Sequence, residues 1–355
     1  MNTGITNIKA LGIMLMVLGH SMCSIPHIIP FISMFHMPLF FIASGYCFNE
    51  KYLDAPLTFL KKRAKGLYVP FVKYGILFAL LHPLFFALHI YDTTYGFHGV
   101  GATKDGWSDI LHSCWIIVTQ MRGTDWLLGG YWFLNALFFG SIIAWVTIRL
   151  SKKTEYAFIA SLTLLALVHV TNFHIVFLNL NTRAFAAAFL FVAGYVIKAK
   201  KIAPFGSVGI IASLALTILG MFYWQMAMDT LSYEKWVLFP YLFTAILTTW
   251  SFYSIFSNHA LTNRIQCFLS FVGENTLTIL TWHLLSFKLV SLAIILAYSL
   301  PIEQLGEFPV IAEYSAKGWW IAYTFIGVGL PLALTKVTNI CHLAYRIHND
   351  PNRHS

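Results

Sequence analysis

Charged residues are scarce in this chain of 355 residues, and their scarcity excludes whole classes of protein. Lys, Arg, Asp and Glu make up only 10% of the residues, whereas a soluble globular chain has roughly 25%. So few charges cannot cover a water-soluble particle of this length, which excludes a soluble enzyme. Intrinsic disorder is excluded too, because the chain is 58% hydrophobic and 17% aromatic, a composition that buries apolar surface readily.

Paired cysteines, repeats and polar linkers are also missing. The five cysteines stand singly and form no C-x-x-C pair, at Cys23, Cys47, Cys114, Cys267 and Cys341. This spacing indicates neither a disulfide framework nor a zinc site, so we expect no bound metal and no redox chemistry. Without a repeat or a long polar linker the chain is predicted to form one transmembrane domain over residues 1–345, followed by a short cytoplasmic tail over residues 346–355.

Long apolar runs are what the sequence does contain. A bilayer core needs roughly 20 apolar residues in a helix, and ten stretches approach this length. They cover residues 8–26, 28–48, 67–90, 131–150, 155–172, 180–198, 206–225, 236–257, 268–298 and 319–340. The ninth is too long for one straight crossing and is expected to bend. The predicted fold class is all-α, a polytopic membrane helix bundle of about ten transmembrane helices.

The distribution of charge predicts how this bundle is oriented. Most of the 23 Lys and Arg residues fall on one side when the connections are sorted alternately, whereas most of the 14 Asp and Glu residues fall on the other. By the positive-inside rule the basic side, with both termini, is cytoplasmic. Contact with anionic lipid is a sufficient role for most of these cations, so a role in ligand binding needs a further argument.

Two polar side chains mark one face of the first span. Lys9 and His20 are eleven residues apart, which is three helical turns and about 20°, so both project from the same face. The rise between them is about 16 Å. A long, thin ligand fits along such a stripe. In the alternative interpretation Lys9 only extends to the membrane surface and His20 bonds to a neighbouring helix.

The second span carries another histidine next to a proline. Pro38 removes a backbone donor and is expected to kink the helix beside His36. His20 and His36 then form a candidate proton-transfer pair, because imidazole titrates near neutrality. Two histidines that merely pack side by side are the alternative.

Other polar residues are candidates for substrate contact. Arg183, at the start of the sixth span, either holds a substrate or oxyanion or anchors the helix at the interface. His283 lies in the ninth span, on the face of Thr276. In the connection 91–130, Asp125 and Trp126 combine a carboxylate with an aromatic face, which suits a polyhydroxylated acceptor, although interfacial tryptophans often only form a belt. Ser108 is expected to cap a short amphipathic helix that lies on the surface as a lid.

These residues together resemble the integral-membrane acyltransferase-3 family, which includes fucose O-acetylase-like enzymes and O-acetyltransferases of surface polysaccharides. The likeness begins with Lys9 and His20, which have ten residues between them as in the family, where the basic residue is usually arginine. It continues through runs of sequence in the same order as in the family, at His36–Phe41, Ser44–Tyr46, Phe59–Arg63, Val69–Phe71, Tyr131–Leu134, Gly194–Tyr195 after Arg183, and Gly273–Thr276 before His283.

The resemblance implies an enzyme that passes an acetyl group from cytoplasmic acetyl-CoA to a hydroxyl of a lipid-linked or surface glycan on the far side of a bacterial inner membrane. Acetyl-CoA is then a co-substrate and no cofactor is permanently bound. Lys9, Lys61, Lys62 and Arg63 are expected to hold the anionic CoA, and His20 serves as general base or carries the acyl group. Membrane lipids are expected partners and nucleic acid is not. A proton-coupled transporter with the same polar cavity is the alternative.

Overall fold

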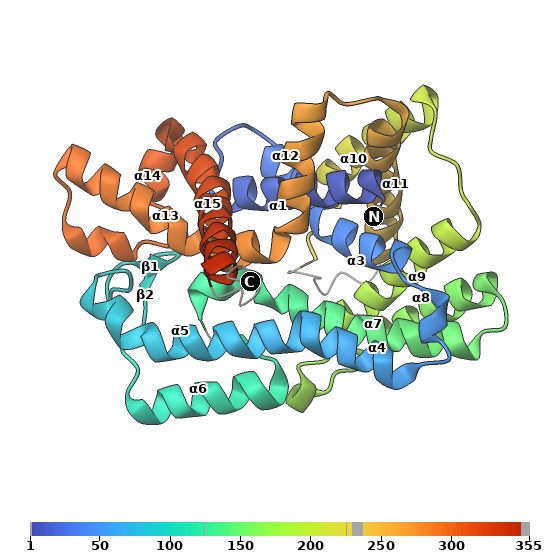
Figure 1. Cartoon of the computed structure of the whole chain (residues 1–355), viewed down its shortest axis with the longest axis horizontal. Coiled ribbons are helices and arrows are strands. Elements are labelled where there is room, and N and C mark those ends of the chain that lie inside the picture. The colour runs from blue at the N-terminus through green and yellow to red at the C-terminus, as the bar shows by residue number, and fades with distance from the viewer. Residues whose placement is uncertain (1, 124, 225, 229–236, 349–355) are drawn as a thin grey trace, which may run out of the picture.

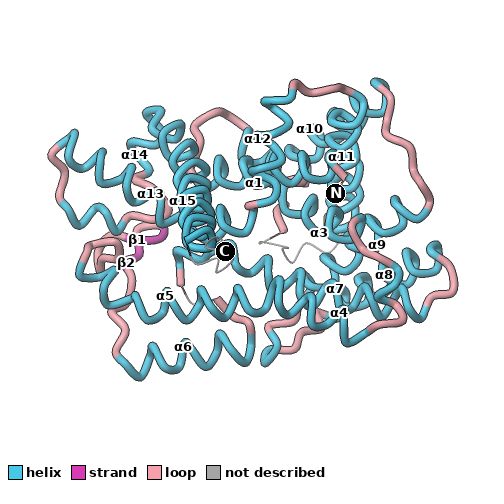
Figure 2. Tube along the Cα trace, viewed as in Figure 1, coloured by secondary structure: helices cyan, strands magenta, loops and turns pink. Residues whose placement is uncertain are grey.

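A computed structural model describes residues 2–123, 125–224, 226–228 and 237–348, with the side chains of residues 338–348 excepted. Eight described helical segments are long and apolar enough to cross a membrane. Sheet structure in the described part is limited to a small hairpin and two isolated bridges (Figures 1 and 2). The predicted all-α polytopic bundle is therefore confirmed. Of the predicted tail, residues 349–355 lie outside the described residues.

The helices follow one another along the chain with short connections. They are α1 (Thr3–His20), α2 (Ile28–Ser33), α3 (His36–Tyr46), α4 (Pro56–Arg63), α5 (Val69–Ala87), α6 (Trp107–Gln120), α7 (Trp132–Leu150), α8 (Thr154–Thr171), α9 (Thr182–Ala199), α10 (Ser207–Tyr223), α11 (Leu238–Asn258), α12 (Asn263–Glu274), α13 (Thr276–Tyr298), α14 (Ala312–Tyr314) and α15 (Trp320–His348). The strands β1 (Gly96–Phe97) and β2 (Val100–Gly101) form the antiparallel hairpin, and 3₁₀ turns cover Glu50–Tyr52, Trp126–Tyr131, Val176–Leu178 and Ile302–Gly306.

Most of the predicted spans coincide with these helices. The expected bend in 268–298 is a break at Asn275, which separates α12 from α13. The span predicted at 8–26 is shifted, because α1 starts at Thr3 and ends at His20. The span predicted at 206–225 is the 17-residue α10. Neither of these two is among the eight segments that meet the length and hydropathy of a crossing helix.

The second span is interrupted, but not where the proline suggested. The break lies at Met34 and Phe35, between α2 and α3, and Phe35 leaves the helical region with φ −148°. Pro38 stands in the first turn of α3, where a backbone N–H has no helical partner to lose. The predicted kink at Pro38 is therefore a clean helix break just before His36.

The predicted surface lid is wrong. The helix α6 packs along α5, with Ile117 buried against Gly75 and the Tyr68 hydroxyl donating to the Val118 carbonyl at 2.8 Å. Its N-cap is Gly106, not Ser108. Trp107, Leu111 and Trp115 are exposed on its other side, so α6 is apolar on two faces and joins the bundle.

Close packing of α3 against α9 forms the centre of the bundle. A Cβ added to Gly45 would lie 1.8 Å from the carbonyl oxygen of Phe191, and one added to Gly194 would lie 2.0 Å from that of Ile42. The obstructing atoms are backbone atoms, which cannot move aside as a flexible side chain does. The two glycines therefore permit contact between the backbones of α3 and α9.

We expect Gly45→Ala to destabilise the protein by about 3 kcal/mol or more, because the new methyl group forces these two backbones apart. Thermal unfolding of the detergent-purified protein would measure the loss. Gly206→Ala is the matched control, since a Cβ there meets no atom within 4 Å. Equal melting temperatures for the two variants would contradict the expected clash.

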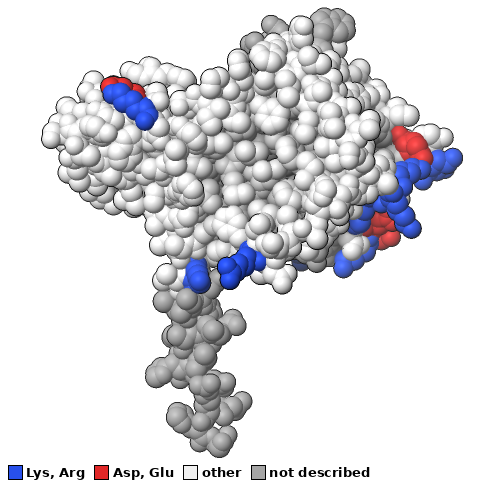
Figure 3. Space-filling view, turned by 90° about the horizontal axis from the view of Figure 1, so that it is seen from above, with Lys and Arg blue, Asp and Glu red and all other residues white. Residues whose placement is uncertain are grey.

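Positive charge gathers at one end of the molecule, which we call the basic end (Figure 3). Contacts join its segments: Arg149 to Asp54 at 3.7 Å, Lys200 to Glu155, and the Lys198 amino group to the Phe48 carbonyl at 2.7 Å. The hairpin β1–β2 and α14 lie towards the opposite end (Figure 1). Acidic side chains lie among these basic ones as well, and Figure 3 shows both signs of charge at the opposite end too.

Candidate active site

Four neighbouring cavities lie along the bundle, and each is named here by its walls. The mouth cavity, of about 140 Å³, is lined by Ser44, Cys47, Tyr52, Phe59, Lys62 and Arg63 among others. The lysine cavity, of about 280 Å³, contains Lys9. The histidine cavity, of about 250 Å³, contains His20 and His36. The aromatic cavity, of about 570 Å³, contains Phe97, Asp125, Trp126, Trp132 and Phe308.

Adjacent cavities share wall residues, so they form one series. Ser44 and Cys47 line both the mouth and the lysine cavities. Met16, Met37 and Leu280 line both the lysine and the histidine cavities. Two residues, His20 and Trp132, line both the histidine and the aromatic cavities. The shared wall residues thus place the cavities next to one another in the order mouth, lysine, histidine and aromatic.

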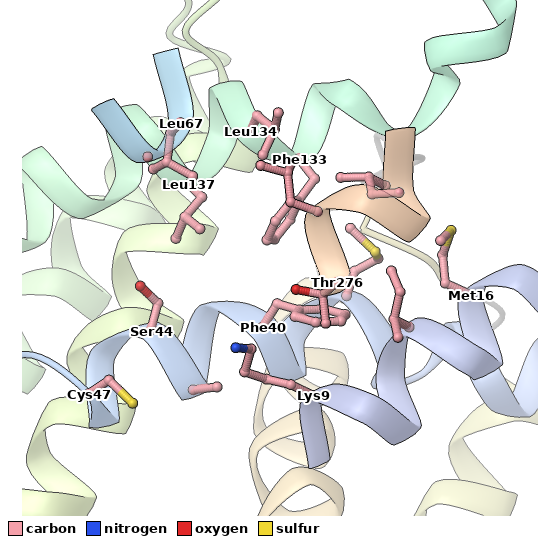
Figure 4. A pocket seen from close by; sticks show the side chains of 16 residues that line it. Lys9, Met16, Phe40, Ser44, Cys47, Leu67, Phe133, Leu134, Leu137 and Thr276 are labelled. Carbon is pink, nitrogen blue, oxygen red and sulfur yellow. The ribbon is translucent and has the colours of Figure 1, made fainter. Parts of the chain in front are cut away.

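Lys9 places a charged amino group in the wall of the lysine cavity. Its amino group points into the cavity from α1, towards the side occupied by Ser44 and Thr276 (Figure 4). Most of the remaining wall is apolar and comes from α3, α7 and α13. A cation that faces an otherwise apolar passage suits a ligand with an anionic group and a long, thin arm.

His20 ends α1 and is held by a second histidine. Its Nδ1 lies 2.8 Å from Nε2 of His283, and the two rings stack with centroids 5.1 Å apart. His283 is fully buried on α13, and its Nδ1 lies 3.0 Å from the carbonyl oxygens of both Ile279 and Leu280. His283 therefore stands behind His20, as a partner of its ring.

These contacts determine which nitrogen of each ring carries a proton. Carbonyl oxygens only accept, so Nδ1 of His283 donates to them. A buried imidazolium without a counter-ion is costly, so His283 is neutral and its Nε2 accepts. His20 must then donate from Nδ1, and in its neutral form the lone pair of His20 lies on Nε2. This is the tautomer that a general base acting from Nε2 requires.

His36 stands on the wall of the same histidine cavity, at the first turn of α3. Its Nδ1 lies 2.8 Å from the carbonyl oxygen of Ile32 and donates to it. The break before α3 leaves that carbonyl outside a continuous helix, which is why a side chain can reach it. The two predicted catalytic histidines thus border one cavity.

Asp125 and Trp126 lie together at the aromatic cavity. The Tyr91 hydroxyl donates to Asp125 Oδ1 at 2.6 Å, and the Leu127 amide donates to the same oxygen at 2.9 Å. Burial raises the pKa of Asp125 above its usual value, and these two hydrogen bonds oppose the rise. The Trp126 ring contacts those of Phe97 and Phe308, so an aromatic wall stands beside the carboxyl group.

Cations line the mouth cavity, and they are two of the four that were predicted, Lys62 and Arg63. The Arg63 guanidinium lies between the rings of Phe59 and Phe191, at 5.2 Å from each centroid, and donates to Ser44 Oγ at 3.1 Å. Lys62 donates to the Tyr52 hydroxyl at 3.0 Å. Lys61 is exposed on α4 beside the cavity rather than in its wall.

Two residues that were predicted to contact a substrate lie behind residues of the cavity walls. The Arg183 guanidinium lies over the Trp132 ring, 5.6 Å from its centroid, so Arg183 supports a residue that faces the cavities. His283 is the buried partner of His20 described above. Neither Arg183 nor His283 is among the described wall residues of the four cavities, and their contact with a substrate stays a prediction.

Sequence analysis missed Lys288. This lysine is buried in α13 and donates to the carbonyl oxygens of Leu305 and Glu307, at 2.8 Å each. It lies over the ring of Phe308, a residue of the aromatic cavity. A charged residue inside an apolar span was the available signal. Lys288 holds the 302–308 segment, and with it one wall of the cavity.

Comparison with known protein families identifies an acyltransferase domain in this chain. The family model Acyl_transf_3, described as an acyltransferase domain, matches residues 2–336. No curated protein and no solved structure matches the chain significantly.

Proposed function

Because this chain belongs to the acyltransferase-3 family, we propose that it is a multi-pass membrane O-acyltransferase of the bacterial cytoplasmic membrane. In this proposal an acyl group, acetyl in the simplest case, passes from a CoA thioester at the basic end to a hydroxyl group of a surface glycan or lipid-linked sugar at the opposite end. The observation that carries it is the series of cavities with His20 at the junction of two of them.

The donor enters through the mouth cavity. Lys62 and Arg63 line this cavity and exposed Lys61 lies beside it, so CoA phosphates meet several cations there. The pantetheine arm then follows the largely apolar lysine cavity past Lys9. Lys9 offers a point charge without the planar fork of an arginine, which suits attraction of a phosphate or carbonyl from several directions.

Transfer takes place at His20, between the two inner cavities. His20 Nε2 takes the proton of the acceptor hydroxyl, while the oxygen of that hydroxyl attacks the thioester carbonyl. The new C–O bond forms, the C–S bond breaks, and the CoA sulfur leaves with the proton that His20 returns. His36 borders the same cavity and serves as a second proton carrier. Donor and acceptor bind on opposite sides of His20, so no acyl-enzyme is needed.

The acceptor binds in the aromatic cavity. Sugar rings present hydroxyl groups at their edges and C–H groups on their faces. Asp125 accepts hydrogen bonds from hydroxyl groups, and the Trp126 ring offers an apolar face. The volume of about 570 Å³ falls in the usual range for small-molecule sites.

The proposal is tested by supplying membranes that contain the protein with radiolabelled acetyl-CoA and surface glycan. We expect label to enter the glycan, with a gain of one acyl mass in the product and release of one thiol per transfer. A transporter would instead move glycan without consuming a thioester. Translocation that proceeds equally with and without acyl-CoA, with no labelled product, would overturn the proposal.

Acceptor binding should depend on pH through Asp125. Since the pKa of Asp125 is raised and its ionised form is the better acceptor of hydroxyl hydrogen bonds, KM for the acceptor is expected to fall as pH rises through that pKa. Asp125→Asn should raise KM by about 10- to 100-fold at neutral pH and abolish this dependence. Initial rates over a pH series would measure both effects.

Tyr91→Phe is the matched variant for this prediction. The Tyr91 hydrogen bond lowers the pKa of Asp125, so its removal should shift the dependence to higher pH without abolishing it. If Asp125→Asn retains the wild-type pH profile of KM, the assignment of Asp125 to the acceptor site is wrong.

A further inference from the structure

We infer that the histidine cavity is an acyl chamber, and that it accepts uncharged aliphatic acyl groups longer than acetyl. The inference rests on the proposed function and adds the class of donor. It is carried by the position of the histidine cavity between Lys9 and the acceptor site, by its size and by the character of its walls.

Position comes first. The lysine cavity shares Met16, Met37 and Leu280 with the histidine cavity. It shares none of its described wall residues with the aromatic cavity. A thioester that arrives past Lys9 therefore reaches His20 through the histidine cavity. The acyl group, at the leading end of the pantetheine arm, occupies the histidine cavity. The acceptor approaches His20 from the aromatic cavity.

Size is the second argument. A single water needs a cavity of roughly 10–15 Å³ measured in the same way, whereas the histidine cavity measures about 250 Å³. The methyl group of acetyl would leave most of this volume unfilled. An enzyme matched to acetyl alone would present a wall close to the carbonyl carbon, because selectivity against longer chains depends on steric exclusion.

Wall chemistry is the third argument. The apolar part of the lining comes mostly from Ile29, Ile32, Met16, Met37 and Leu280. Among the described wall residues none is Lys, Arg, Asp or Glu. Among the described wall residues, a dicarboxylic acyl group would find no permanent positive charge, only the imidazoles of His20 and His36, and burying a charge without a counter-charge is costly. The lining thus favours a plain aliphatic chain.

One residue offers a sharp test of this chamber. Gly19 lies in the wall next to His20, and a Cβ added there meets no atom within 4 Å. A side chain at this position therefore begins in open space beside the cavity. Gly129 in the aromatic cavity and Gly66 in the lysine cavity offer matched positions, since an added Cβ meets only one atom, at 4.0 Å, at Gly129 and none at Gly66.

The experiment measures binding of acetyl-CoA and butyryl-CoA to the purified full-length protein by calorimetry, without acceptor. Each methylene buried in an apolar cavity contributes about fourfold in affinity, so we expect butyryl-CoA to bind about 15-fold more tightly than acetyl-CoA. In Gly19→Leu the ratio should fall to one or below, with Gly19→Ala between the two. Gly129→Leu should leave the ratio unchanged, and Gly66→Leu should weaken both donors alike.

The outcomes distinguish this inference from the proposed acyltransferase function on which it rests. If both thioesters bind to the wild-type protein with equal affinity, or acetyl-CoA binds more tightly, the chamber is refuted while the acyltransferase stands. The chamber is likewise refuted if folded Gly19→Leu keeps the wild-type ratio of butyryl-CoA to acetyl-CoA affinity. If leucine impairs folding, Gly19→Ala serves as the second variant. If neither thioester binds to folded protein, the proposed donor itself is refuted.

Discussion

The substitution His20→Ala is expected to lower the rate of acyl transfer by about 10²- to 10⁴-fold. His20 lines both inner cavities and is the one described histidine that does so. Without its imidazole the acceptor hydroxyl has no base at the thioester. Incorporation of label from acetyl-CoA into surface glycan would measure the loss, in membranes that contain equal amounts of folded protein.

His174→Ala is the control for this experiment. His174 is exposed in a loop, where its Nδ1 contacts the Asn172 carbonyl oxygen, so the variant should transfer acyl groups at the wild-type rate. Binding of acetyl-CoA should survive in both variants, because the cations of the mouth cavity are unchanged. A His20→Ala protein that labels the glycan as fast as wild type would show that the base lies elsewhere.

The second large effect is expected from His283→Leu. This residue is not among the described wall residues of the four cavities, yet its Nε2 lies within hydrogen-bond distance of His20 Nδ1, so it can fix the tautomer of the ring that we propose as the base. Leucine fills similar space but accepts no hydrogen bond. We expect kcat to fall about 10²-fold, with KM for the donor little changed, because His283 acts as a positioning residue and not as a binding one.

Two further variants separate orientation from simple packing. In His283→Gln the side-chain carbonyl can accept from His20 Nδ1, so activity should recover to within about tenfold of wild type. The double variant His20→Ala/His283→Leu should be no slower than His20→Ala alone, since residues that act as a unit are not additive. If glutamine is as inactive as leucine, or the two losses add, His283 contributes to packing rather than to the tautomer.

Lys288 shows how the remaining wall of the site is maintained. Its ammonium group bonds to two backbone carbonyls of one loop and lies over Phe308. A buried cation needs such partners, because isolated charge in an apolar interior is expensive. The loop is thereby tied to α13, the helix that also supplies His283. One helix thus contacts both His20 and the segment that forms one wall of the aromatic cavity.

The sequence by itself determined the class of the protein, its approximate spans, and the alignment of Lys9 with His20. The reasons are local: composition restricts which solvent the surface can face, and eleven residues in a helix return to nearly the same direction. The same reasoning located the interruption before His36 to within a few residues. Asp125 and Trp126, adjacent in the chain, were also paired correctly as neighbours of one cavity.

Tertiary structure alone decided what surrounds these residues. His20 and His283 are 263 positions apart, and whether they meet depends on how α1 and α13 rotate against one another. Helical periodicity says which residues of one helix share a face, but not which face of another helix it will meet. For the same reason the sequence did not show that the Arg183 guanidinium lies over the Trp132 ring. In a membrane bundle an apolar face can contact lipid or protein equally well, so packing between helices decides which faces meet.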